Sequence, residues 1–170
     1  AVLIDGVPAT HVSNNVDAAL QVITVNGTRI YDDSQKYYML NKPQGVISAT
    51  TDKEHTTVID LFANENVEGL YLLGRLDGDT EGLLLVTNNG PLGYRMLNPD
   101  QNIEKEYYVE VNGPLDEDAV ETFKRGVVFH GGYQCKPSTL TIIESSDSLS
   151  RATVTISEGK FHQVKKMFLC

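Results

Sequence analysis

The spacing of apolar residues near the start of the chain predicts a β-hairpin. In residues 19–33, ALQVITVNGTRIYDD, apolar and polar positions alternate on both sides of Asn26 and Gly27. Asn-Gly is typical of two-residue hairpin turns because both of its residues tolerate positive φ angles. We therefore expect a hairpin within a small β-rich unit over residues 1–35.

The next pattern predicts a short strand over residues 37–41, in YYMLNKPQGV. Pro43 and Gly45 follow it and favour a turn, with Lys42 at the turn itself. A second domain is expected to begin here.

Three later segments predict further elements of a second domain. Residues 83–87, LLLVT, form a continuous apolar run, which is typical of a strand buried on both faces. Residues 90–97, GPLGYRML, suit a short helix. Residues 106–111, EYYVEV, alternate as a half-buried strand does.

The last part of the chain predicts two helices and a strand. Residues 115–126, LDEDAVETFKRG, begin with acidic residues, end with basic ones and stop at Gly126, which indicates a helix. Residues 151–170 predict a strand, a glycine turn and a basic amphipathic helix. Because strands and helices do not alternate strictly, the pattern indicates an α+β fold.

Composition narrows the class of protein. The chain has 170 residues, 41% of them hydrophobic and 22% charged, which suits a globular domain with a core. It contains neither an apolar run long enough to span a membrane nor a signal-peptide pattern. Cys135 and Cys170 lie far apart and outside any CxxC pair, which argues against a disulfide framework and a zinc site. We expect a cytoplasmic protein that does not associate with membranes.

The charge is uneven along the chain. A net charge of −9 taken alone argues against a polyanionic partner such as nucleic acid. Residues 151–170 nevertheless carry four Lys or Arg and one Glu, a net charge of +3, which leaves −12 for residues 1–150. A basic patch is therefore expected on an acidic body.

Alternate acidic residues mark the segment 74–90, GRLDGDTEGLLLVTNNG. Asp77, Asp79 and Glu81 fit the first ligands of an EF-hand calcium loop, but Asn88 stands where that loop needs a bidentate Glu. A phosphatase-like D-x-D-x-T reading is weak, because Gly74 interrupts the strand that should precede it. A solvated acidic turn is the ordinary structural interpretation.

Four motifs decide among these interpretations. YYMLNKPQGVIS, GRLDGDTEGLLLVTNNG, EKEYYVEV and SEGKFHQVKKMF occur in the order found in bacterial pseudouridine synthases. The chain resembles the RsuA type of this family, and most closely the branch that acts on 16S ribosomal RNA. The resemblance implies isomerisation of a uridine of the uridine-516 type to pseudouridine. It also implies a pseudouridine synthase fold, with a mixed, largely antiparallel sheet and flanking helices.

The resemblance also implies two domains. Residues 1–35 match the later, strand-rich part of an S4-like RNA-binding domain, without the helices that usually precede it, and residues 36–170 match the catalytic domain. Family members continue beyond MFLC with further strands. We therefore expect a partial S4-like domain and a catalytic domain that is incomplete at its C-terminus.

Three catalytic residues are implied by the same resemblance. The catalytic aspartate falls on Asp77, the active-site tyrosine on Tyr107 and the basic partner on Lys165. The carboxylate can attack C6 of the base or C1′ of the ribose, or stabilise positive character at C1′, and the sequence leaves these routes open. Lys165 would keep Asp77 ionised, and Tyr107 would contact the uracil and handle the C5 proton. Isomerisation needs no redox step, so neither a metal nor a cofactor is expected.

The implied partner is ribosomal RNA, bound by a monomer. The target uridine must leave its stack, so basic residues are needed for the flanking phosphates. A lone lysine, tyrosine or histidine in these places would ordinarily be structural. The candidates for RNA binding are Arg75, Lys42, Lys105, Lys160, His162 and Lys166.

Two alternatives stay open. Large-subunit branches of the family tend to carry Arg in place of His162 or Lys165, so HQVKKMF favours the small subunit over a 23S ribosomal RNA enzyme. The other alternative is a non-catalytic RNA-binding or ribosome-assembly module. The joint presence of Asp77, Tyr107 and Lys165 favours the enzyme.

Overall fold

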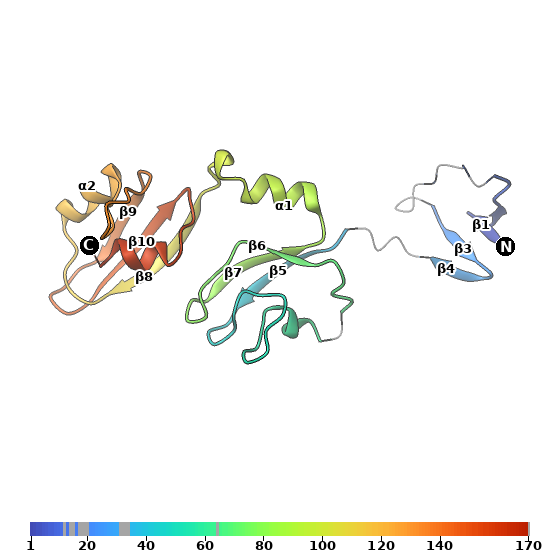
Figure 1. The fold of residues 1–170 in the computed structure, drawn as a ribbon, viewed down its shortest axis with the longest axis horizontal. Helices are drawn as coiled ribbons and strands as arrows, with labels where there is room; N and C mark the ends of the chain where they lie inside the picture. Colours follow the sequence, from blue (N-terminus) through green and yellow to red (C-terminus); the bar gives the residue numbers. More distant parts are fainter. Residues whose placement is uncertain (12, 14–15, 17–20, 31–34, 64, 170) are drawn as a thin grey trace. The chain divides into compact units, whose positions relative to one another are not determined.

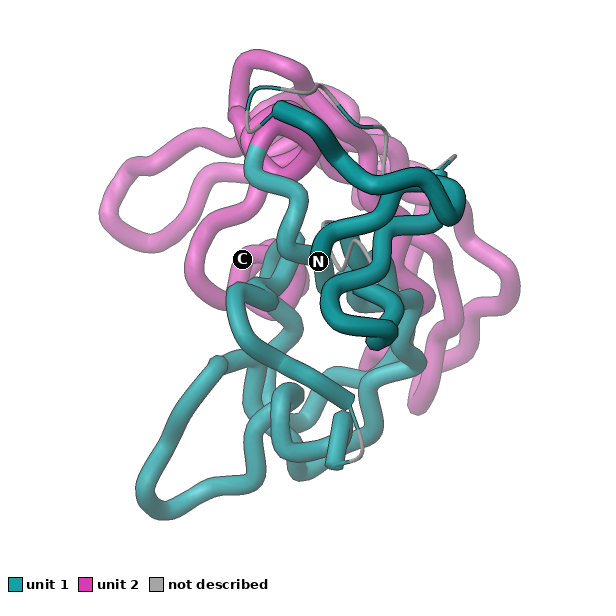
Figure 2. Tube along the Cα trace, turned by 90° about the vertical axis from the view of Figure 1, so that its right-hand side faces the viewer, with its two compact units in different colours: residues 1–90 teal, residues 91–170 magenta. Residues whose placement is uncertain are grey.

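The protein forms two compact units, residues 1–90 and residues 91–170 (Figure 2). The computed structural model describes residues 1–11, 13, 16, 21–30, 35–63 and 65–169. The division between the units falls inside the catalytic domain expected over residues 36–170, at a place where the sequence pattern indicates no boundary. Each unit is described by itself below.

The first strands of unit 1 form a four-stranded antiparallel sheet in the order β2-β1-β3-β4 (Figure 1). Asn26 and Gly27 both have positive φ angles, 51° and 83°, as a two-residue hairpin turn requires. The predicted hairpin is therefore confirmed. Its strands are part of the set β1 (Val2–Ile4), β2 (Val7–Pro8), β3 (Ile23–Val25) and β4 (Thr28–Ile30).

The rest of unit 1 contains a second antiparallel sheet, in the order β5-β7-β6. Its strands are β5 (Tyr37–Lys42), β6 (Tyr71–Leu73) and β7 (Gly82–Thr87), and a 3-10 helix, η1 (Ile59–Phe62), lies between β5 and β6 in the chain. One face of this sheet packs on a small core made of Val46, Val58, Leu70, Leu84 and Val86.

Strand β7 differs from its predicted environment. Leu84 and Val86 are buried, but Leu83 is 64% exposed, so the strand is not covered on both faces. The prediction of two buried faces was wrong because an apolar run does not identify its neighbours: β7 lies between two antiparallel strands, and burial on both faces is characteristic of parallel sheets.

The described part of unit 2 combines a three-stranded antiparallel sheet with three α-helices and one 3-10 helix. The sheet has the order β8-β10-β9, with the seven residues of β8 paired to those of β10. The predicted helix over residues 90–97 is confirmed as α1, which spans the junction of the units. The elements are α1 (Gly90–Leu97), η2 (Pro99–Gln101), β8 (Lys105–Val111), α2 (Glu117–Arg125), β9 (Thr139–Glu144), β10 (Ser150–Ile156) and α3 (Gln163–Met167).

Helix α2 begins and ends at the signals that the sequence carries. The Asp116 carboxylate accepts a hydrogen bond from the Ala119 amide at 2.9 Å, which satisfies one of the free amides of the first turn. At the other end Gly126 has a φ of 91°, and a Cβ there would lie 2.2 Å from the Cys135 carbonyl oxygen. The chain can therefore leave α2 in this direction only with glycine.

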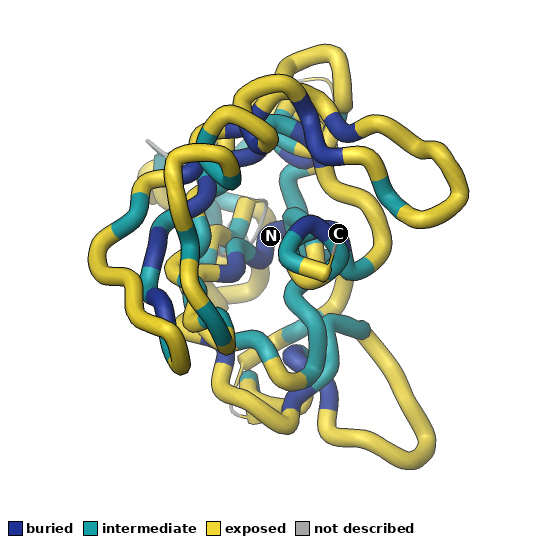
Figure 3. The backbone as a smooth tube through the Cα atoms, turned by 90° about the vertical axis from the view of Figure 1, so that its left-hand side faces the viewer, coloured by how far each residue is buried: buried dark blue, intermediate teal, exposed yellow. Residues whose placement is uncertain are grey.

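The core of unit 2 is built from alternate residues of its strands. Strand β8 alternates between half-buried and exposed positions, as predicted, and β10 alternates between buried and half-buried ones. Buried stretches are accordingly short and lie between exposed loops (Figure 3). The buried core residues are Phe123, Val127, Cys135, Leu140, Ala152, Val154, Ile156 and Met167.

The architecture is α+β, as the sequence predicts. Among the residues that the structure describes, all paired strands are antiparallel, and one isolated parallel bridge joins Ile47 and Thr57. Within the described ranges, no helix has both the length and the apolar character that a membrane span requires.

Candidate active site

Asp77 lies on a tight turn between β6 and β7. The Thr80 amide donates to the Asp77 carbonyl at 3.0 Å, which closes the turn, and the Asp77 side chain is half-buried. A solvated turn was the ordinary interpretation of this segment. The structure does contain a turn. It differs from a turn held only by solvent because the residues on both sides of Asp77 are hydrogen-bonded to another part of the chain.

Both neighbours of Asp77 are hydrogen-bonded to the segment that follows β5. The Ser48 hydroxyl donates to the Leu76 carbonyl at 2.7 Å and accepts from the Leu76 amide at 3.0 Å. On the other side, the Gly45 amide donates to the Gly78 carbonyl at 2.7 Å. The backbone on each side of the carboxylate is thus held by a different part of the chain, 28 residues away in the case of Ser48.

Lys42 lies close enough to this turn to interact electrostatically with the carboxylates of Asp79 and Asp77. It is the last residue of β5, its side chain is fully buried, and its ammonium donates to the Pro43 carbonyl at 2.9 Å and the Val46 carbonyl at 2.6 Å. Burial lowers the pKa of Lys42, and the carboxylates of Asp79 and Asp77 oppose this by stabilising the charged form. Lys42 therefore places a positive charge near Asp77 inside unit 1.

The burial of Lys42 favours a role in ordering the site over a contact with phosphate. A direct contact with RNA requires an accessible ammonium, whereas this one is enclosed and already donates to two carbonyls. Arg75, by contrast, is exposed on the loop just before Asp77, where a phosphate can reach it. Asp79 is exposed as well.

Tyr107 lies in unit 2, on β8. It is half-buried, pairs with Val154 of β10 and packs against the core of the unit. Lys105, two residues earlier, is also half-buried, and its ammonium donates to the Ile103 carbonyl at 3.0 Å.

Lys165 lies on the exposed face of α3. The neighbouring positions Gln163 and Met167 are buried, so the helix directs Lys165 away from the core. Lys166 is half-buried, with its ammonium 5.1 Å from the centre of the Phe161 ring. The predicted basic amphipathic helix is confirmed, although α3 is short.

A buried carboxylate, Glu158, orders the loop that leads into α3. Its oxygens accept hydrogen bonds from the Tyr133 hydroxyl at 3.0 Å, the Lys136 amide at 2.9 Å and the Gln163 side-chain amide at 2.9 Å. Burial raises the pKa of Glu158, but these hydrogen bonds, together with the positive charge of Lys160, lower it more, so the net pKa lies below its usual value.

The positioning roles of Glu158, Gln163 and Ser48 were not predicted from the sequence. Glu158 and Gln163 stand in SEGKFHQVKKMF, and Ser48 ends YYMLNKPQGVIS. Their presence in these motifs was the one feature of the sequence that could have pointed to a role in the site. Gln163 lies five residues from Glu158, but Tyr133 and Lys136 lie 25 and 22 residues from it, and Leu76 lies 28 residues from Ser48. Local patterns do not identify such distant partners.

The structure groups the candidate residues by unit. Unit 1 brings Lys42 and Asp77 together and places Arg75 beside them in the chain. Unit 2 contains Tyr107 and Lys165. Unit 2 also contains the remaining candidates Lys105, Lys160, His162 and Lys166.

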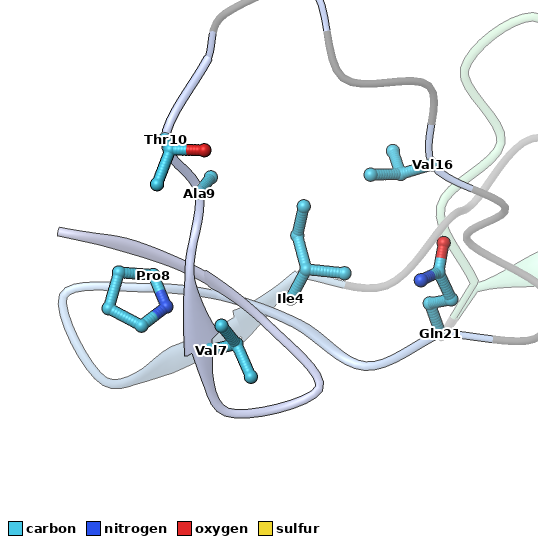
Figure 4. Close-up of a pocket in the computed structure, with 7 residues that line it drawn as sticks. All are labelled: Ile4, Val7, Pro8, Ala9, Thr10, Val16 and Gln21. Carbon is cyan, nitrogen blue, oxygen red and sulfur yellow. The ribbon is translucent and has the colours of Figure 1, made fainter.

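Two further observations concern ligand sites. The part of the chain that the structure describes contains no group of three or more His, Cys, Asp or Glu arranged to hold a metal ion. A hollow lies against the first sheet of unit 1, and its labelled side chains are apolar or neutral (Figure 4). The described residues that line the hollow therefore include no acid or base. Its lining residues are Ile4, Val7, Pro8, Ala9, Thr10, Val16 and Gln21.

Comparison with known proteins identifies the class. Residues 36–169 match the model of the RNA pseudouridylate synthase family, which is more than half of the chain. The chain belongs to this family. A solved structure described as a pseudouridylate synthase is 32% identical and superposes with a TM-score of 0.72, covering 99% of this chain and 71% of that one.

Curated relatives narrow the comparison to the RsuA type. An uncharacterized RNA pseudouridine synthase of Bacillus subtilis, YtzG, is 41% identical over 98% of this chain and 70% of its own length. Ribosomal small subunit pseudouridine synthase A of Escherichia coli K12 is 40% identical over 78% of this chain. The match covers 56% of the Escherichia coli enzyme, little more than half of its length.

Proposed function

We propose that this protein converts a uridine of small-subunit ribosomal RNA to pseudouridine, and that the uridine is of the uridine-516 type. Support comes from the family match over residues 36–169 and from relatives named as small-subunit pseudouridine synthases. The segment HQVKKMF, which retains His162 and Lys165, also favours the small-subunit branch.

The observation that carries this proposal is the fixed turn around Asp77. Isomerisation breaks the bond between N1 and C1′, joins C5 to C1′, releases the C5 proton and returns a proton to N1. Each route open to the enzyme, attack at C6, attack at C1′ or stabilisation of positive character at C1′, needs an ionised carboxylate held in place. The hydrogen bonds from Ser48 and Gly45 to the residues beside Asp77 hold the backbone in this way.

In the proposed mechanism Asp77 reacts with the nucleoside, and Tyr107 and Lys165 assist it. Lys165 supplies the positive charge that pairs with the Asp77 carboxylate in this mechanism. The buried ammonium of Lys42, which the Asp79 and Asp77 carboxylates stabilise, is a second cation near Asp77 within unit 1. The Tyr107 ring stacks on the uracil, and its hydroxyl accepts the C5 proton or passes it to water. These three assignments rest on the motifs and on the chemistry of the reaction.

RNA binding in this proposal depends on the exposed basic residues. The uridine is taken out of its stack, and cationic side chains hold the flanking phosphates. Arg75 is accessible in unit 1, and Lys160 is exposed in unit 2. Lys105, His162 and Lys166 are half-buried candidates for the same role.

Release of tritium from C5-labelled uridine tests the proposed function. Transcripts of 16S and 23S ribosomal RNA, each labelled at C5 of uridine, are incubated separately with the protein. We expect release from the 16S transcript, because only formation of the C5–C1′ bond displaces that hydrogen. Release from 23S RNA alone would assign the large subunit, and binding without release from either RNA would favour the non-catalytic module.

A further inference from the structure

Unit 2 carries a cluster of aromatic rings and lysines around the loop that leads into α3. Phe161 and His162 stack with their ring centres 3.8 Å apart and their planes at 21°. The Lys166 ammonium lies 5.1 Å from the Phe161 ring centre and 5.9 Å from that of Phe129. We call this cluster the aromatic–lysine patch; its members are Phe129, Tyr133, Lys160, Phe161, His162 and Lys166.

Lys160, Tyr133 and Phe129 also place an ammonium group beside an aromatic ring. The Lys160 ammonium lies 5.3 Å from the centre of the Tyr133 ring, and the Tyr133 and Phe129 rings are 5.9 Å apart. Phe161 is 66% exposed and Tyr133 is 43% exposed. Phe161, Tyr133 and Lys160 are therefore accessible at the surface, whereas Phe129, His162 and Lys166 are half-buried beside them.

The backbone under the patch is held before any ligand binds. His162 has a positive φ of 53°, which turns the chain sharply beside Phe161. The Lys160 amide donates to the Gln163 side chain at 2.8 Å, and the Tyr133 hydroxyl donates to Glu158 at 3.0 Å. These bonds keep the polar end of Tyr133 on the protein, while much of the ring stays accessible.

We propose that the aromatic–lysine patch binds a single-stranded stretch of the RNA substrate, with a base stacked on Phe161 and the adjacent phosphate held by Lys160 or Lys166. Exposed rings supply stacking surfaces for bases, and nearby ammonium groups neutralise phosphates. This inference rests on the proposed function. It adds the surface that binds the RNA and the expectation that this RNA is single-stranded.

Charge complementarity favours RNA over a protein partner. The chain carries −9 overall, but residues 151–170 carry +3. The one acidic residue of that segment, Glu158, is buried and accepts three hydrogen bonds, one of them from Tyr133 of the patch. Its charge also acts on Lys160, and the two lysines of the patch outnumber this one buried carboxylate. An accessible surface of lysines between rings matches a polyanion that carries flat bases.

Binding of a short single-stranded oligoribonucleotide containing uridine tests the patch with the full chain. We expect Phe161→Leu to weaken binding about fivefold or more, since loss of one stacked base costs at least that factor. Phe161→Tyr keeps a ring and should retain the affinity. Lys160→Gln should reduce the slope of log affinity against log salt by about 0.7.

Matched controls lie elsewhere in unit 2. Tyr94 on α1 is 71% exposed, so Tyr94→Leu removes an accessible ring from outside the patch. Lys124 on α2 has a side chain 72% exposed, and Lys124→Gln removes an accessible charge. Both variants should bind the oligoribonucleotide within twofold of the parent protein.

The outcomes separate the patch from the proposed function. Equal affinity and salt slope for the parent, Phe161→Leu and Lys160→Gln would overturn the patch, even if tritium release is intact, and would leave a protein partner as the explanation of the exposed rings. Weaker binding by the patch variants together with no tritium release by the parent would support the patch and overturn the proposed function. If Phe161→Leu does not fold, as judged by circular dichroism, Lys160→Gln decides the outcome.

Discussion

At the scale of single residues, Asp77 and Asp79 provide a matched pair on one turn. Both carboxylates act electrostatically on Lys42, yet only Asp77 has neighbours fixed on each side by Ser48 and Gly45. Substitutions at the two positions can therefore be compared: both remove a negative charge near Lys42, but only the substitution of Asp77 removes the proposed reactive group.

Asp77→Asn should abolish turnover while leaving RNA affinity nearly unchanged. The neutral amide has the same shape but neither attacks carbon nor stabilises positive charge, so the loss falls on the barrier and costs several kcal/mol. Tritium release under single-turnover conditions measures this effect. Asp79→Asn is the control and should retain most activity; the reverse pattern would assign the reactive carboxylate to Asp79.

Lys42→Met should destabilise unit 1. The substitution keeps an unbranched apolar side chain, one atom shorter, but leaves the Pro43 and Val46 carbonyls without their donor, which costs about 1–3 kcal/mol. Denaturant unfolding followed by circular dichroism measures the change. Lys124→Met, at an accessible position, is the control; equal stability of the two variants would mean that the buried ammonium does not support the turn.

Glu158 should make a pH-dependent contribution to stability. Its pKa is lowered in the folded protein from an ordinary value of 4.5, because its hydrogen bonds and Lys160 outweigh the effect of burial. A lowered pKa stabilises the fold fully above 4.5, and this stability is lost as the pH falls through 4.5 to the folded-state value.

Glu158→Gln tests this dependence. One of the donors that now meet a carboxylate oxygen would face the amide nitrogen of glutamine, so the variant should be less stable at neutral pH. The difference in unfolding free energy between parent and variant should then shrink as the pH falls below 4.5. A difference independent of pH would show that the charge of Glu158 is unimportant.

At the scale of elements, the structure separates what local patterns predict from what they do not. Helix α2 was predicted because its Asp116 cap and its Gly126 stop act within the element. Strand β9 was not predicted, and the exposure of Leu83 in β7 was misjudged. The exposure of Leu83 depends on β5, which pairs with β7 from a distant part of the sequence, and a run of apolar residues does not identify that neighbour. Strand β9 was missed although it pairs with β10, the next strand in the chain.

The same distinction applies to the candidate site. Asp77, Tyr107 and Lys165 were assigned from motif resemblance, and their catalytic roles stay predictions. The burial of Lys42 and the role of Glu158 in ordering its loop were not foreseen. The reason is physical: tertiary contacts determine which charges and hydrogen-bond donors surround these residues. The order of the motifs along the chain gives only the order of the elements and not these contacts.

Gly126→Ala tests the end of α2 as an element. Its φ of 91° is strained for alanine, at a cost of about 1–3 kcal/mol, and the added Cβ would lie 2.2 Å from the Cys135 carbonyl oxygen, which costs more. A marked loss of thermal stability is therefore expected. Gly90→Ala meets no atom within 4 Å and should change stability little; similar effects of both substitutions would contradict the steric argument.

At the scale of the whole molecule, the family match begins at residue 36, where the chain is well anchored. The Lys36 amide donates to the Asn88 side chain at 2.7 Å, and its carbonyl accepts from the Thr87 hydroxyl at 2.5 Å. The four-stranded sheet of residues 1–35 is hydrogen-bonded within itself. We propose that this part is an S4-like RNA-binding segment that adds affinity but no chemistry.

Removal of residues 1–35 tests whether this segment contributes to RNA binding and not to catalysis. The shortened chain should bind ribosomal RNA more weakly and with a smaller salt slope, yet reach the same tritium release rate at saturating RNA. Filter binding over a salt series and single-turnover kinetics measure the two properties. Loss of turnover at saturation, in a chain that remains folded, would place part of the catalytic machinery in residues 1–35.

The hydrogen bonds around Asp77 also bear on when the protein becomes competent during synthesis. Ser48, Gly45 and Lys42 reach the translation exit before residues 74–87, and all of them belong to unit 1. The aspartate turn can thus close as soon as β7 pairs with β5, while the residues of unit 2 are still being added. A nascent chain would then carry its ordered carboxylate before Tyr107 and Lys165 have taken their places in the folded second unit, so catalytic activity would be acquired only when the second unit has folded.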